Sequence, residues 1–385
     1  MKKLVKLVPI EFINQTRDYR ELQVLREIGD INIIVVAKGA CNNIVEHDFY
    51  TLHTLTTRPL KFIPIKLNRI VSFFLWARYI RKLKADIISC HDLICFAIGY
   101  ISSLFLYKKP KLVYDSHEFE FGRNSSRSKL ASLCVLLAER FLIKRCAFSI
   151  MVNDTIADAV QELHKLKERP LVIRNMQNYV DVDETVVQQQ RERYNTLFHF
   201  KKDDFIVLYH GAIMNGRGIE NIIKAITDTK GIKCIILGFG EGAYIQKLKQ
   251  LIAKNQLEGT VVFHDAVPQE ELWKYVGAVD VGVVMIDNIC LSYYYSLPNK
   301  FFQNVQAHTP VIGSDFPEIK RMIEKYNIGL VCKNESPEAL RESIICLKDD
   351  KSLYNRCKKN LKIASKELCW ENEKKVLIDA YKAIL

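Results

Sequence analysis

Short apolar segments alternate with longer amphipathic segments along almost the whole chain, and the alternation runs through both halves. A strand that is buried on both faces reads as a short apolar run, whereas a helix repeats its apolar residues every three or four positions. Alternating strands and helices form parallel sheets with helices on both faces. The chain is therefore predicted to be an α/β protein, and its 385 residues suffice for two such domains.

The first half is predicted to form one doubly wound domain over residues 1–175. Its expected strands cover residues 4–10, 31–37, 62–65, 86–90, 111–114, 148–152 and 171–173. Its expected helices cover residues 18–28, 67–83, 93–106, 127–146 and 155–166. The polar segment that follows, residues 176–204, has no strand pattern and is expected to connect the two domains.

The second half repeats this scheme over residues 205–369. Its expected strands cover residues 206–210, 234–237, 261–264, 281–285, 311–313 and 330–332. Two helices at residues 337–347 and 353–365 follow the last strand, and residues 370–385 are expected to form one more. Open α/β sheets bind ligands beyond the carboxyl ends of their strands, so the functional residues are expected in the loops that follow the strands.

The segment YYYSLPNKFFQNVQAHTPVI, residues 293–312, reads as a loop, a helix and a strand that begins at Pro310. Ser296 suits the N-cap of that helix, and Pro298 suits its first turn. Lys300 then falls near the free N–H groups of the helix start, where a phosphate or diphosphate binds well. An ordinary surface helix would show the same pattern. The buried face of the helix is predicted to consist of Phe301, Phe302 and Val305.

This segment resembles the donor-binding segment of glycosyltransferase family 4, in which Leu-Pro-Asn-Lys commonly leads into the helix. Further stretches resemble the same family and occur in its order along the chain. They are YDSHE at residues 114–118, VLYHGAIMNGRGIENIIKAI at 207–226, IILGFGEG at 235–242 and VFHDAVPQEELWKYVGAVDVGVVM at 262–285. The resemblance covers nearly the whole chain.

The resemblance implies the GT-B fold, in which two Rossmann-like, doubly wound parallel-sheet domains face a cleft and the terminal helix, here residues 370–385, crosses back to the first domain. It also implies a hexosyltransferase-type enzyme of bacterial polysaccharide or glycoconjugate biosynthesis. Such an enzyme moves a sugar, with retention, from a UDP- or GDP-sugar to a lipid-linked or saccharide acceptor. No cofactor is expected, and no nucleic acid partner, because the chain has no zinc finger, helix-turn-helix or RNP signature.

Arg217 and Lys300 are the candidates that neutralise the leaving diphosphate of the donor. Arg217 precedes a helix that is expected to begin at Gly218, and the resemblance places a phosphate-binding cation there. A metal-binding Asp-x-Asp motif is not expected in this chain, so these cations and helix N-termini, rather than a metal, are expected to balance the charge of the leaving group. Gly238 and Gly240 are expected to form a tight turn that lets the backbone approach the diphosphate.

Two predicted strands of the first domain end in a histidine beside an acid: His91-Asp92 and His117-Glu118. An imidazole at a strand end can bond hydroxyl groups of the donor sugar or position the acceptor hydroxyl. Alternatively, it can bind a backbone carbonyl and have no role in catalysis. The resemblance favours His117 as the catalytic residue. From their positions at the strand ends, His91, Asp92 and Glu118 are expected on the acceptor side or at the donor sugar.

Two positions depart from the family pattern. Members commonly carry two glutamates separated by seven residues, and here Tyr295 and Gln303 hold these places; with Asn299 they are expected to contact the donor sugar and ribose. A glutamine can accept one hydrogen bond and donate another, but it is not an anionic clamp. This change keeps open a catalytically inactive partner subunit, and a GT-B nucleotide-sugar 2-epimerase is a second alternative. His308 stands where a helix-ending glycine is usual, and histidine tolerates left-handed backbone.

The positive charge of the chain is concentrated in its first half. Residues 1–180 hold 28 Lys and Arg against 17 Asp and Glu, whereas residues 181–385 hold 28 against 27. An acidic partner is therefore expected for the first half, such as an anionic membrane leaflet or a diphosphate-linked lipid. Residues 58–84 could lie in a membrane interface, although a domain helix with a solvated basic face would look the same. They combine Phe73, Phe74, Leu75 and Trp76 with Lys61, Lys66, Arg69, Arg78, Arg81, Lys82 and Lys84.

The cysteines and the apolar runs bear on the location of the protein. The eleven cysteines are scattered without a Cys-x-x-Cys pair and are expected to be reduced. No apolar stretch reaches the roughly 18 residues that a membrane-spanning helix needs, and the first residues do not form a signal peptide pattern. A cytoplasmic protein is expected, with peripheral attachment to the inner leaflet of the cell membrane as an extension of the charge argument.

Overall fold

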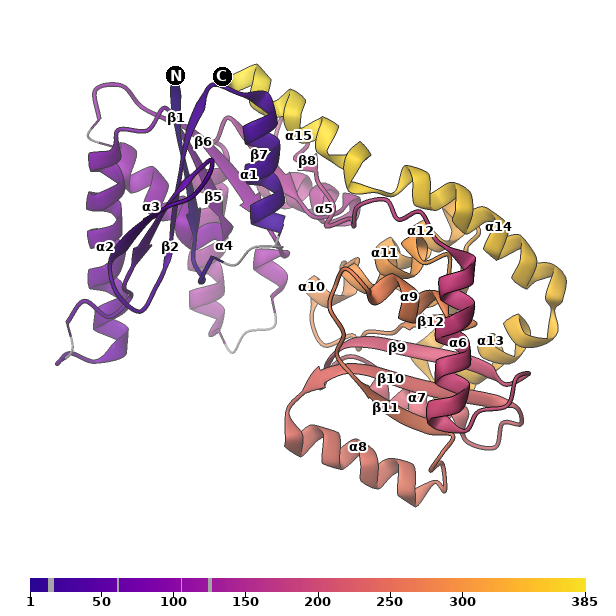
Figure 1. The fold of residues 1–385 in the computed structure, drawn as a ribbon. Coiled ribbons are helices and arrows are strands. Elements are labelled where there is room, and N and C mark those ends of the chain that lie inside the picture. Colours follow the sequence, from indigo (N-terminus) through magenta and orange to yellow (C-terminus); the bar gives the residue numbers. More distant parts are fainter. Residues whose placement is uncertain (13–16, 61, 105, 124–126) are drawn as a thin grey trace. The chain divides into compact units, whose positions relative to one another are not determined.

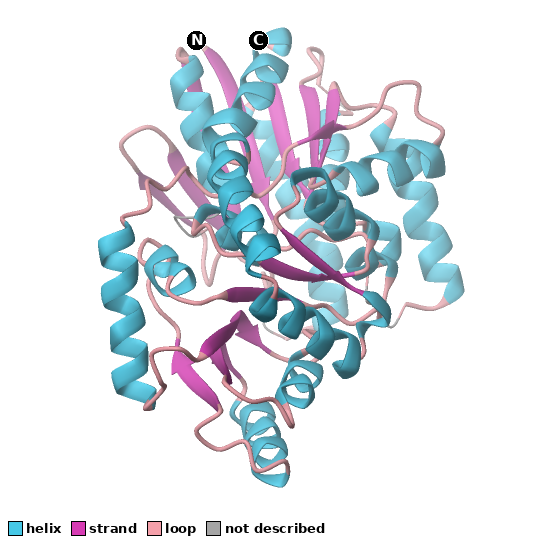
Figure 2. Cartoon of the chain, turned by 90° about the vertical axis from the view of Figure 1, so that its right-hand side faces the viewer, coloured by secondary structure: helices cyan, strands magenta, loops and turns pink. Residues whose placement is uncertain are grey.

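The computed structural model describes residues 1–12, 17–60, 62–104, 106–123 and 127–385. The chain divides into two compact units: unit 1 is Met1–Asn175 with Glu373–Leu385, and unit 2 is Met176–Asn372. Each unit contains one sheet with helices packed against it, as Figure 1 shows, and Figure 2 shows the strands in magenta among the cyan helices. The predicted α/β class, with one parallel-sheet domain in each half, is confirmed.

The sheet of unit 1 has eight strands in the order β3-β4-β2-β1-β5-β6-β7-β8. All neighbouring strands are parallel except the pair β3 and β4. β1 has β2 on one side and β5 on the other. The order in which successive strands are added to the sheet therefore reverses between β1 and β5. The strands are β1 (Lys2–Val8), β2 (Ile31–Lys38), β3 (Asn43–Glu46), β4 (Thr51–Leu55), β5 (Ile87–His91), β6 (Lys111–Ser116), β7 (Phe148–Met151) and β8 (Leu171–Val172).

The terminal helix α15 (Trp370–Ile384) belongs to unit 1 from Glu373 onward. Figure 1 shows α15, in yellow, beside α1. Lys374 Nζ lies 2.8 Å from Glu27 Oε1, and the Tyr381 hydroxyl donates to Glu21. The other helices of unit 1 are α1 (Arg17–Ile28), α2 (Ile65–Leu83), α3 (Asp92–Ser103), η1 (Glu120–Gly122), α4 (Lys129–Ile143) and α5 (Asp154–His164).

Two features of unit 1 differ from the prediction. The strand expected at residues 62–65 is wrong, because Phe62 lies in a turn and Ile65 begins α2 directly after Pro64. Proline cannot donate to a sheet and is well suited to the position before a helix. The hairpin of β3 and β4 was not predicted. All residues of β3 are exposed, so it lacks the buried apolar run by which the other strands were recognised.

Unit 2 contains a fully parallel six-stranded sheet in the order β11-β10-β9-β12-β13-β14. Its strands are β9 (Phe205–Ile213), β10 (Ile232–Gly240), β11 (Val261–Asp265), β12 (Val281–Val284), β13 (Val311–Ser314) and β14 (Gly329–Cys332). Its helices after α6 (Glu184–Phe198) are α7 (Ile219–Ile226), α8 (Gly242–Lys254), α9 (Leu272–Gly277), α10 (Leu291–Tyr294), α11 (Asn299–Gln306), α12 (Pro317–Tyr326), η2 (Lys333–Glu335), α13 (Pro337–Asp349) and α14 (Lys351–Glu367).

The segment expected to connect the domains, residues 176–204, contains the helix α6 (Glu184–Phe198). Tyr194 of α6 is fully buried in a core cluster of unit 2. The helix follows an Asp-x-Asp sequence at residues 181–183, and Asp183 caps it by accepting from the N–H of Thr185 at 2.8 Å. This acidic pair precedes a helix rather than following a strand, so Asp183 serves the helix start.

Two observations concern the cysteines and membrane insertion. All eleven cysteines carry free thiols, among them the buried Cys90, Cys234 and Cys332. Within the described part of the chain, no helix has both the length and the apolar character that a membrane span requires.

Candidate functional site

The carboxyl ends of β9 and β12 form the candidate ligand-binding edge of unit 2. The strand order reverses at β9, which lies between β10 and β12, and open α/β sheets bind ligands at such a reversal. The loop after β9 reaches α7 through Gly216 and Gly218, whose positive φ angles of 82° and 70° suit glycine. The loop after β12 contacts it, since the N–H of Asp287 donates to the carbonyl oxygen of Gly216 at 3.2 Å. These loops carry Arg217 and lead to Lys300.

Arg217 and Lys300 lie against aromatic rings rather than against acids. Arg217 Cζ is 5.4 Å from the centroid of the Tyr293 ring, and Lys300 Nζ is 4.6 Å from that of Tyr209. Lys300 also donates to the carbonyl oxygen of Met285 at 3.0 Å. Among the described residues, no carboxylate oxygen lies within 4.0 Å of either cation. Both positive charges are thus left for an anion to neutralise.

Burial changes the acid–base behaviour of Lys300, which is only 7% exposed. Burial opposes the ammonium form and Arg217 adds repulsion, so the pKa of Lys300 falls to about 7 although Asp287 acts in the opposite sense. Burial also raises the pKa of Asp287, and the charge of Glu220 contributes to that rise. An anion that reaches Lys300 would favour its protonated form.

The start of α11 differs from the prediction. Pro298 takes the N-cap position and Asn299 is the first helical residue, whereas the hydroxyl of Ser296 donates to the carbonyl oxygen of Tyr293 at 2.8 Å. Ser296 therefore closes the turn after α10, a short helix within the predicted loop. Asn299 is exposed, next to the N–H groups that a helix start leaves unpaired. The predicted buried face is confirmed for Phe301, Phe302 and Val305.

Gln303 pairs with a histidine that the sequence analysis missed. His210 Nε2 and Gln303 Oε1 are 3.1 Å apart, and His210 is only 1% exposed. Burial, with Lys300 adding repulsion, lowers the pKa of His210 to about 3. The neutral ring therefore donates to Gln303, whose amide nitrogen is left as a donor. The signal in the sequence was a histidine within an otherwise apolar strand. Tyr295, the other departure from the family pattern, ends α10 and is half-buried.

Gly238 and Gly240 lie within β10, which extends to Gly240, rather than in a turn after it. A Cβ atom on Gly238 would come within 1.9 Å of the carbonyl oxygen of Gly211, and one on Gly240 within 2.1 Å of that of Ile213. Both carbonyls belong to the neighbouring strand β9. The close pairing of β9 and β10 therefore requires these glycines whether or not a ligand approaches them.

Two histidines meet at the carboxyl edge of the unit 1 sheet. His91 is the last residue of β5, and His117 follows the parallel neighbour β6. The centroids of their rings are 3.6 Å apart, with the ring planes inclined by 31°. The side chain of His91 is 8% exposed and that of His117 is 21% exposed. His117 is therefore the more accessible of the two to a ligand.

A separate carboxylate holds each imidazole. His117 Nε2 lies 3.2 Å from Asp115 Oδ2, and His91 Nδ1 lies 2.9 Å from Asp18 Oδ2. Burial opposes a charged His91 ring, but the hydrogen bond and charge of Asp18 outweigh burial and raise its pKa. The backbone N–H of His117 donates to Asp92 Oδ1 at 3.1 Å. Both the ring and the main chain of His117 are thus fixed.

Glu118, expected on the acceptor side, forms an ion pair beside this cluster. Arg123 Nε lies 3.0 Å from Glu118 Oε2, and Arg123 Nη1 lies 3.5 Å from Asp92 Oδ2. The same guanidinium bonds Glu120 at 2.8 Å. Arg123 therefore ties Glu118 and Asp92 to η1, and both acids have a cationic partner within the unit.

Behind the histidines lies the fully buried Lys6 of β1. Its Nζ contacts Glu21 and lies 3.0 Å from Asp18 Oδ1 and 4.0 Å from Asp115 Oδ2. Asp18, His91 and His117 offer ligand atoms within 4.8 Å of one another, a spacing that a metal ion could use. However, the Lys6 ammonium already balances the charge of Asp18. Lys6, Asp18 and Asp115 are not among the predicted site residues, and the signal for them is a lysine inside an apolar strand.

Two family profiles match the chain. Residues 25–179 match the profile described as Glycosyltransferase Family 4, and residues 190–363 match the profile described as Glycosyl transferases group 1. This chain is a family 4-like glycosyltransferase. A search of curated protein sequences finds no significant match.

Solved structures share the fold of this glycosyltransferase. Sucrose-phosphate synthase from Thermosynechococcus elongatus matches with a TM-score of 0.77 and 16% identity, over 100% of this chain and 99% of its own. HepE from Anabaena, in complex with UDP and glucose, matches with a TM-score of 0.74 and 13% identity, over 99% and 98%. A glycosyltransferase from Rickettsia africae ESF-5 matches with a TM-score of 0.71 and 13% identity, over 100% and 98%. The shared fold is GT-B.

The two units of the glycosyltransferase present different chemistry at their sheet edges. The edge of unit 2 offers two cations and the N–H groups at the start of α11, which suit an anion. The edge of unit 1 offers imidazoles held by carboxylates, which suit hydroxyl binding and proton transfer. An enzyme that moves a sugar from a phosphate to a hydroxyl group needs both kinds of site.

Proposed function

We propose that this glycosyltransferase moves a sugar, with retention, from a nucleotide sugar to a lipid- or saccharide-linked acceptor in polysaccharide or glycoconjugate biosynthesis. One observation carries the proposal: Arg217 and Lys300 stand at the ligand-binding edge of unit 2, with no carboxylate oxygen of the described residues within 4.0 Å. A diphosphate would supply the missing negative charge. Fixed cations of this kind favour the charge that develops on the leaving group.

The donor is proposed to be a UDP- or GDP-sugar. The similar HepE structure is a complex with UDP and glucose, and a similar structure from E. coli is bound with UDP-2-fluoro glucose. The amide nitrogen of Gln303 and the side chain of Asn299 could bond hydroxyl groups of the sugar or ribose. A neutral amide at position 303 can serve as such a donor, so the loss of the usual glutamate is compatible with catalysis.

His117 is proposed to bond a hydroxyl of the donor sugar or to position the acceptor hydroxyl. Its ring is partly exposed, and Asp115 holds it at 3.2 Å. A carboxylate in contact with one ring nitrogen fixes the orientation of the ring and leaves the other nitrogen for the ligand. His91 is the less accessible ring and supports His117 by stacking against it.

Metal independence is part of the proposal, since Arg217 and Lys300 can balance the leaving diphosphate. Turnover should therefore continue in EDTA. A loss of activity in EDTA that magnesium restores would show that a divalent cation shares this role.

Peripheral attachment to an anionic leaflet through α2 is also proposed. Phe74 and Leu75 are 58% and 46% exposed, whereas Trp76 is 5% exposed and packs inside the unit, contrary to the expectation that it reaches the interface. Lys61 lies outside the described residues. Each Lys or Arg near such a surface contributes about 1 kcal/mol. The exposed basic residues of α2 include Lys66, Arg78 and Lys82.

Sedimentation with liposomes tests the attachment. The wild type should pellet with vesicles that contain anionic lipid, and less so at high salt. The triple variant Lys66→Gln, Arg78→Gln, Lys82→Gln should pellet less. Equal pelleting on neutral and anionic vesicles, or no effect of the three changes, would rule the attachment out.

The donor proposal is tested by a thermal-shift panel of UDP-, GDP-, ADP- and CMP-sugars. A ligand at a hundred times its dissociation constant stabilises the folded state by about 2.7 kcal/mol, which is readily measured. At least one nucleotide sugar should raise the melting temperature of the wild type, and the shift should shrink in Arg217→Ala. A flat response to the whole panel would favour the inactive partner subunit instead.

A further inference from the structure

A cavity of about 830 Å³ opens at the carboxyl edge of the unit 1 sheet. Its walls come from the ends of β1, β2 and β4 and from the first turns of α2 and α3, so we name it the α2–α3 cavity. Its volume is typical of sites for small ligands. Since α3 begins directly after His91, the cavity shares its sheet edge with His91 and His117.

Part of the lining of the α2–α3 cavity is apolar. Phe73 and Trp76 of α2, Ile94 of α3 and Ile65 are among its lining residues. Ile65 and Ile94 are 51% and 54% exposed, which is a poor environment for such side chains in water. The apolar surface continues along α2, where the exposed side chains are Leu67, Ile70, Phe74 and Leu75. This lining and helix suit an apolar chain.

Basic residues also line the α2–α3 cavity. They are Lys38, Arg58 and Arg69, and Glu11 is the acidic residue among the lining residues. Within the described residues, no carboxylate oxygen lies within 4.0 Å of these three cations. Three cations against one acid favour a ligand with negative charge, and arginine binds phosphate oxygens in pairs.

The loop that carries Arg58 is held in place by the buried Asn68. The Asn68 side chain accepts from the N–H of Leu60 at 3.1 Å and donates to the carbonyl oxygens of Leu60 and Ile63 at 2.7 and 2.9 Å. The N–H of Arg58 donates to Thr56 Oγ1 at 3.1 Å. The backbone around Arg58 is therefore held by hydrogen bonds, which lowers the entropy cost of binding.

We propose that the α2–α3 cavity binds the acceptor, and that this acceptor is a saccharide carried on a lipid phosphate or diphosphate. The phosphate lies against Lys38, Arg58 and Arg69, the first part of the lipid chain lies along Phe73 and Trp76, and the sugar extends toward the histidine edge. The inference rests on the proposed function and narrows its acceptor to one chemical class. A neutral oligosaccharide would leave both the cations and the apolar lining unused.

Tryptophan fluorescence can follow binding to this cavity, because Trp76 lines it and the chain has only three tryptophans. The probe is farnesyl diphosphate, a short isoprenoid diphosphate, titrated into the full-length protein. Farnesol and inorganic pyrophosphate are the comparison ligands, since each keeps one half of the probe. Trp76→Phe identifies the reporter, because the signal should disappear in that variant.

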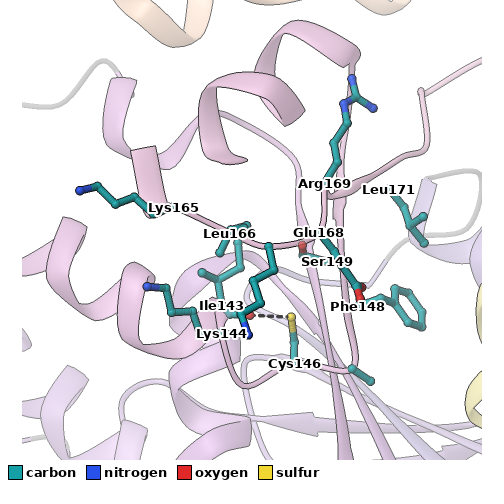
Figure 3. A pocket seen from close by; sticks show the side chains of 12 residues that line it. Ile143, Lys144, Cys146, Phe148, Ser149, Lys165, Leu166, Glu168, Arg169 and Leu171 are labelled. Carbon is teal, nitrogen blue, oxygen red and sulfur yellow. Dashed lines mark hydrogen bonds between the residues drawn. The ribbon is translucent and has the colours of Figure 1, made fainter. Parts of the chain in front are cut away.

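Arg58→Gln with Arg69→Gln is the test variant, and a second cavity of about 480 Å³ supplies the control. This second cavity lies where β7 and β8 begin, at the opposite edge of the same sheet, and Figure 3 shows Lys165 among its lining residues. Lys165→Gln with Lys167→Gln removes the same charge there. Both double variants change exposed side chains and should melt close to the wild type.

Farnesyl diphosphate should bind saturably, and its Kd should rise at least about tenfold in the arginine variant but not in the lysine variant. Farnesol and pyrophosphate should each bind at least about tenfold more weakly than the probe. Equal affinity for pyrophosphate would mean a site for free anions. An unchanged Kd in the arginine variant would also overturn the assignment.

The thermal-shift panel separates this inference from the proposed function. Nucleotide sugars should stabilise the arginine variant as much as the wild type, because Arg58 and Arg69 are not among the proposed donor-binding residues. A wild type that binds farnesyl diphosphate but no nucleotide sugar would contradict the donor proposal alone. Stabilisation by a nucleotide sugar without a response to the probe would contradict the cavity assignment alone.

Discussion

Two buried lysines, one in each unit, show opposite electrostatics. Lys6 of unit 1 contacts Glu21 and Asp18, and these acids outweigh its burial and raise its pKa. Lys300 of unit 2 has a backbone carbonyl at 3.0 Å and an aromatic ring as neighbours, and burial lowers its pKa to about 7. Lys6 is thus neutralised by the fold itself, whereas Lys300 is not.

This difference indicates that the charge of Lys6 stabilises the fold, whereas the charge of Lys300 is available to bind a ligand. A buried ion pair is costly to break, since removing one partner leaves the other uncompensated. Lys6 joins β1 to α1, and α15 reaches the same acid through Tyr381. A buried cation without an acid is retained at a cost in stability, and such perturbed groups are typical of functional sites. An anionic ligand is therefore expected to neutralise the charge of Lys300.

The largest effect is expected from removing each lysine in turn. Lys6→Met should lower the free energy of unfolding by about 3–5 kcal/mol, because Asp18 and Glu21 lose their cation. Lys300→Met should change it by no more than about 1 kcal/mol, since no acid is left without a partner. Urea titrations of both variants measure this contrast. Equal losses of stability in the two variants would contradict the claim that Lys6 stabilises the fold and Lys300 does not.

Arg217→Ala tests whether the second cation of unit 2 acts in catalysis and not in stability. The variant should lose about 2–4 kcal/mol of transition-state stabilisation, the effect of removing one fixed charge-stabilising group. Its stability should be close to that of the wild type, because Arg217 has no carboxylate within 4.0 Å among the described residues. Lys224→Ala, at the other end of α7, is the control. A large drop in melting temperature with unchanged turnover would make Arg217 a structural residue.

The two histidines of unit 1 are expected to differ in role: His117 contacts the ligand, and His91 supports His117. His117→Ala should lower turnover by about a hundredfold, the lower range for a group that positions or transfers a proton. His91→Ala should lower it less, and neither variant should unfold. Kinetics and melting curves of both variants decide this. A greater loss of turnover in His91→Ala would reverse the assignment.

The order of strands and helices could be predicted from the sequence, because the apolar pattern of a buried strand or an amphipathic helix lies within one short segment. The same holds for Lys300, which a Pro-Asn-Lys sequence places at a helix start. The partners of Lys6 could not be found this way. Asp18 and Glu21 come from α1 and Asp115 from β6, and they meet Lys6 only when β1, α1 and β6 pack together. The hairpin of β3 and β4 was missed because an exposed strand needs no apolar run.

Proton uptake on donor binding follows from the unpaired state of Lys300. Below pH 7, Lys300 is protonated in the free and the bound protein, so affinity for the donor should be flat. Above pH 7, the free lysine loses its proton while the diphosphate raises its pKa in the complex. Affinity should then fall by up to about tenfold per pH unit. The diphosphate diester of a nucleotide sugar stays fully ionised over this range and contributes no proton of its own.

Calorimetry tests most directly whether a bound anion neutralises Lys300. The ligand is the nucleotide sugar that stabilises the protein in the thermal-shift panel. Titrations at pH 8, in two buffers with different ionisation enthalpies, report the protons exchanged on binding. The wild type should take up close to one proton, and Lys300→Met should bind at least about tenfold more weakly and take up none. Binding without proton uptake, or equal affinity in Lys300→Met, would contradict the claim that a donor diphosphate completes this site.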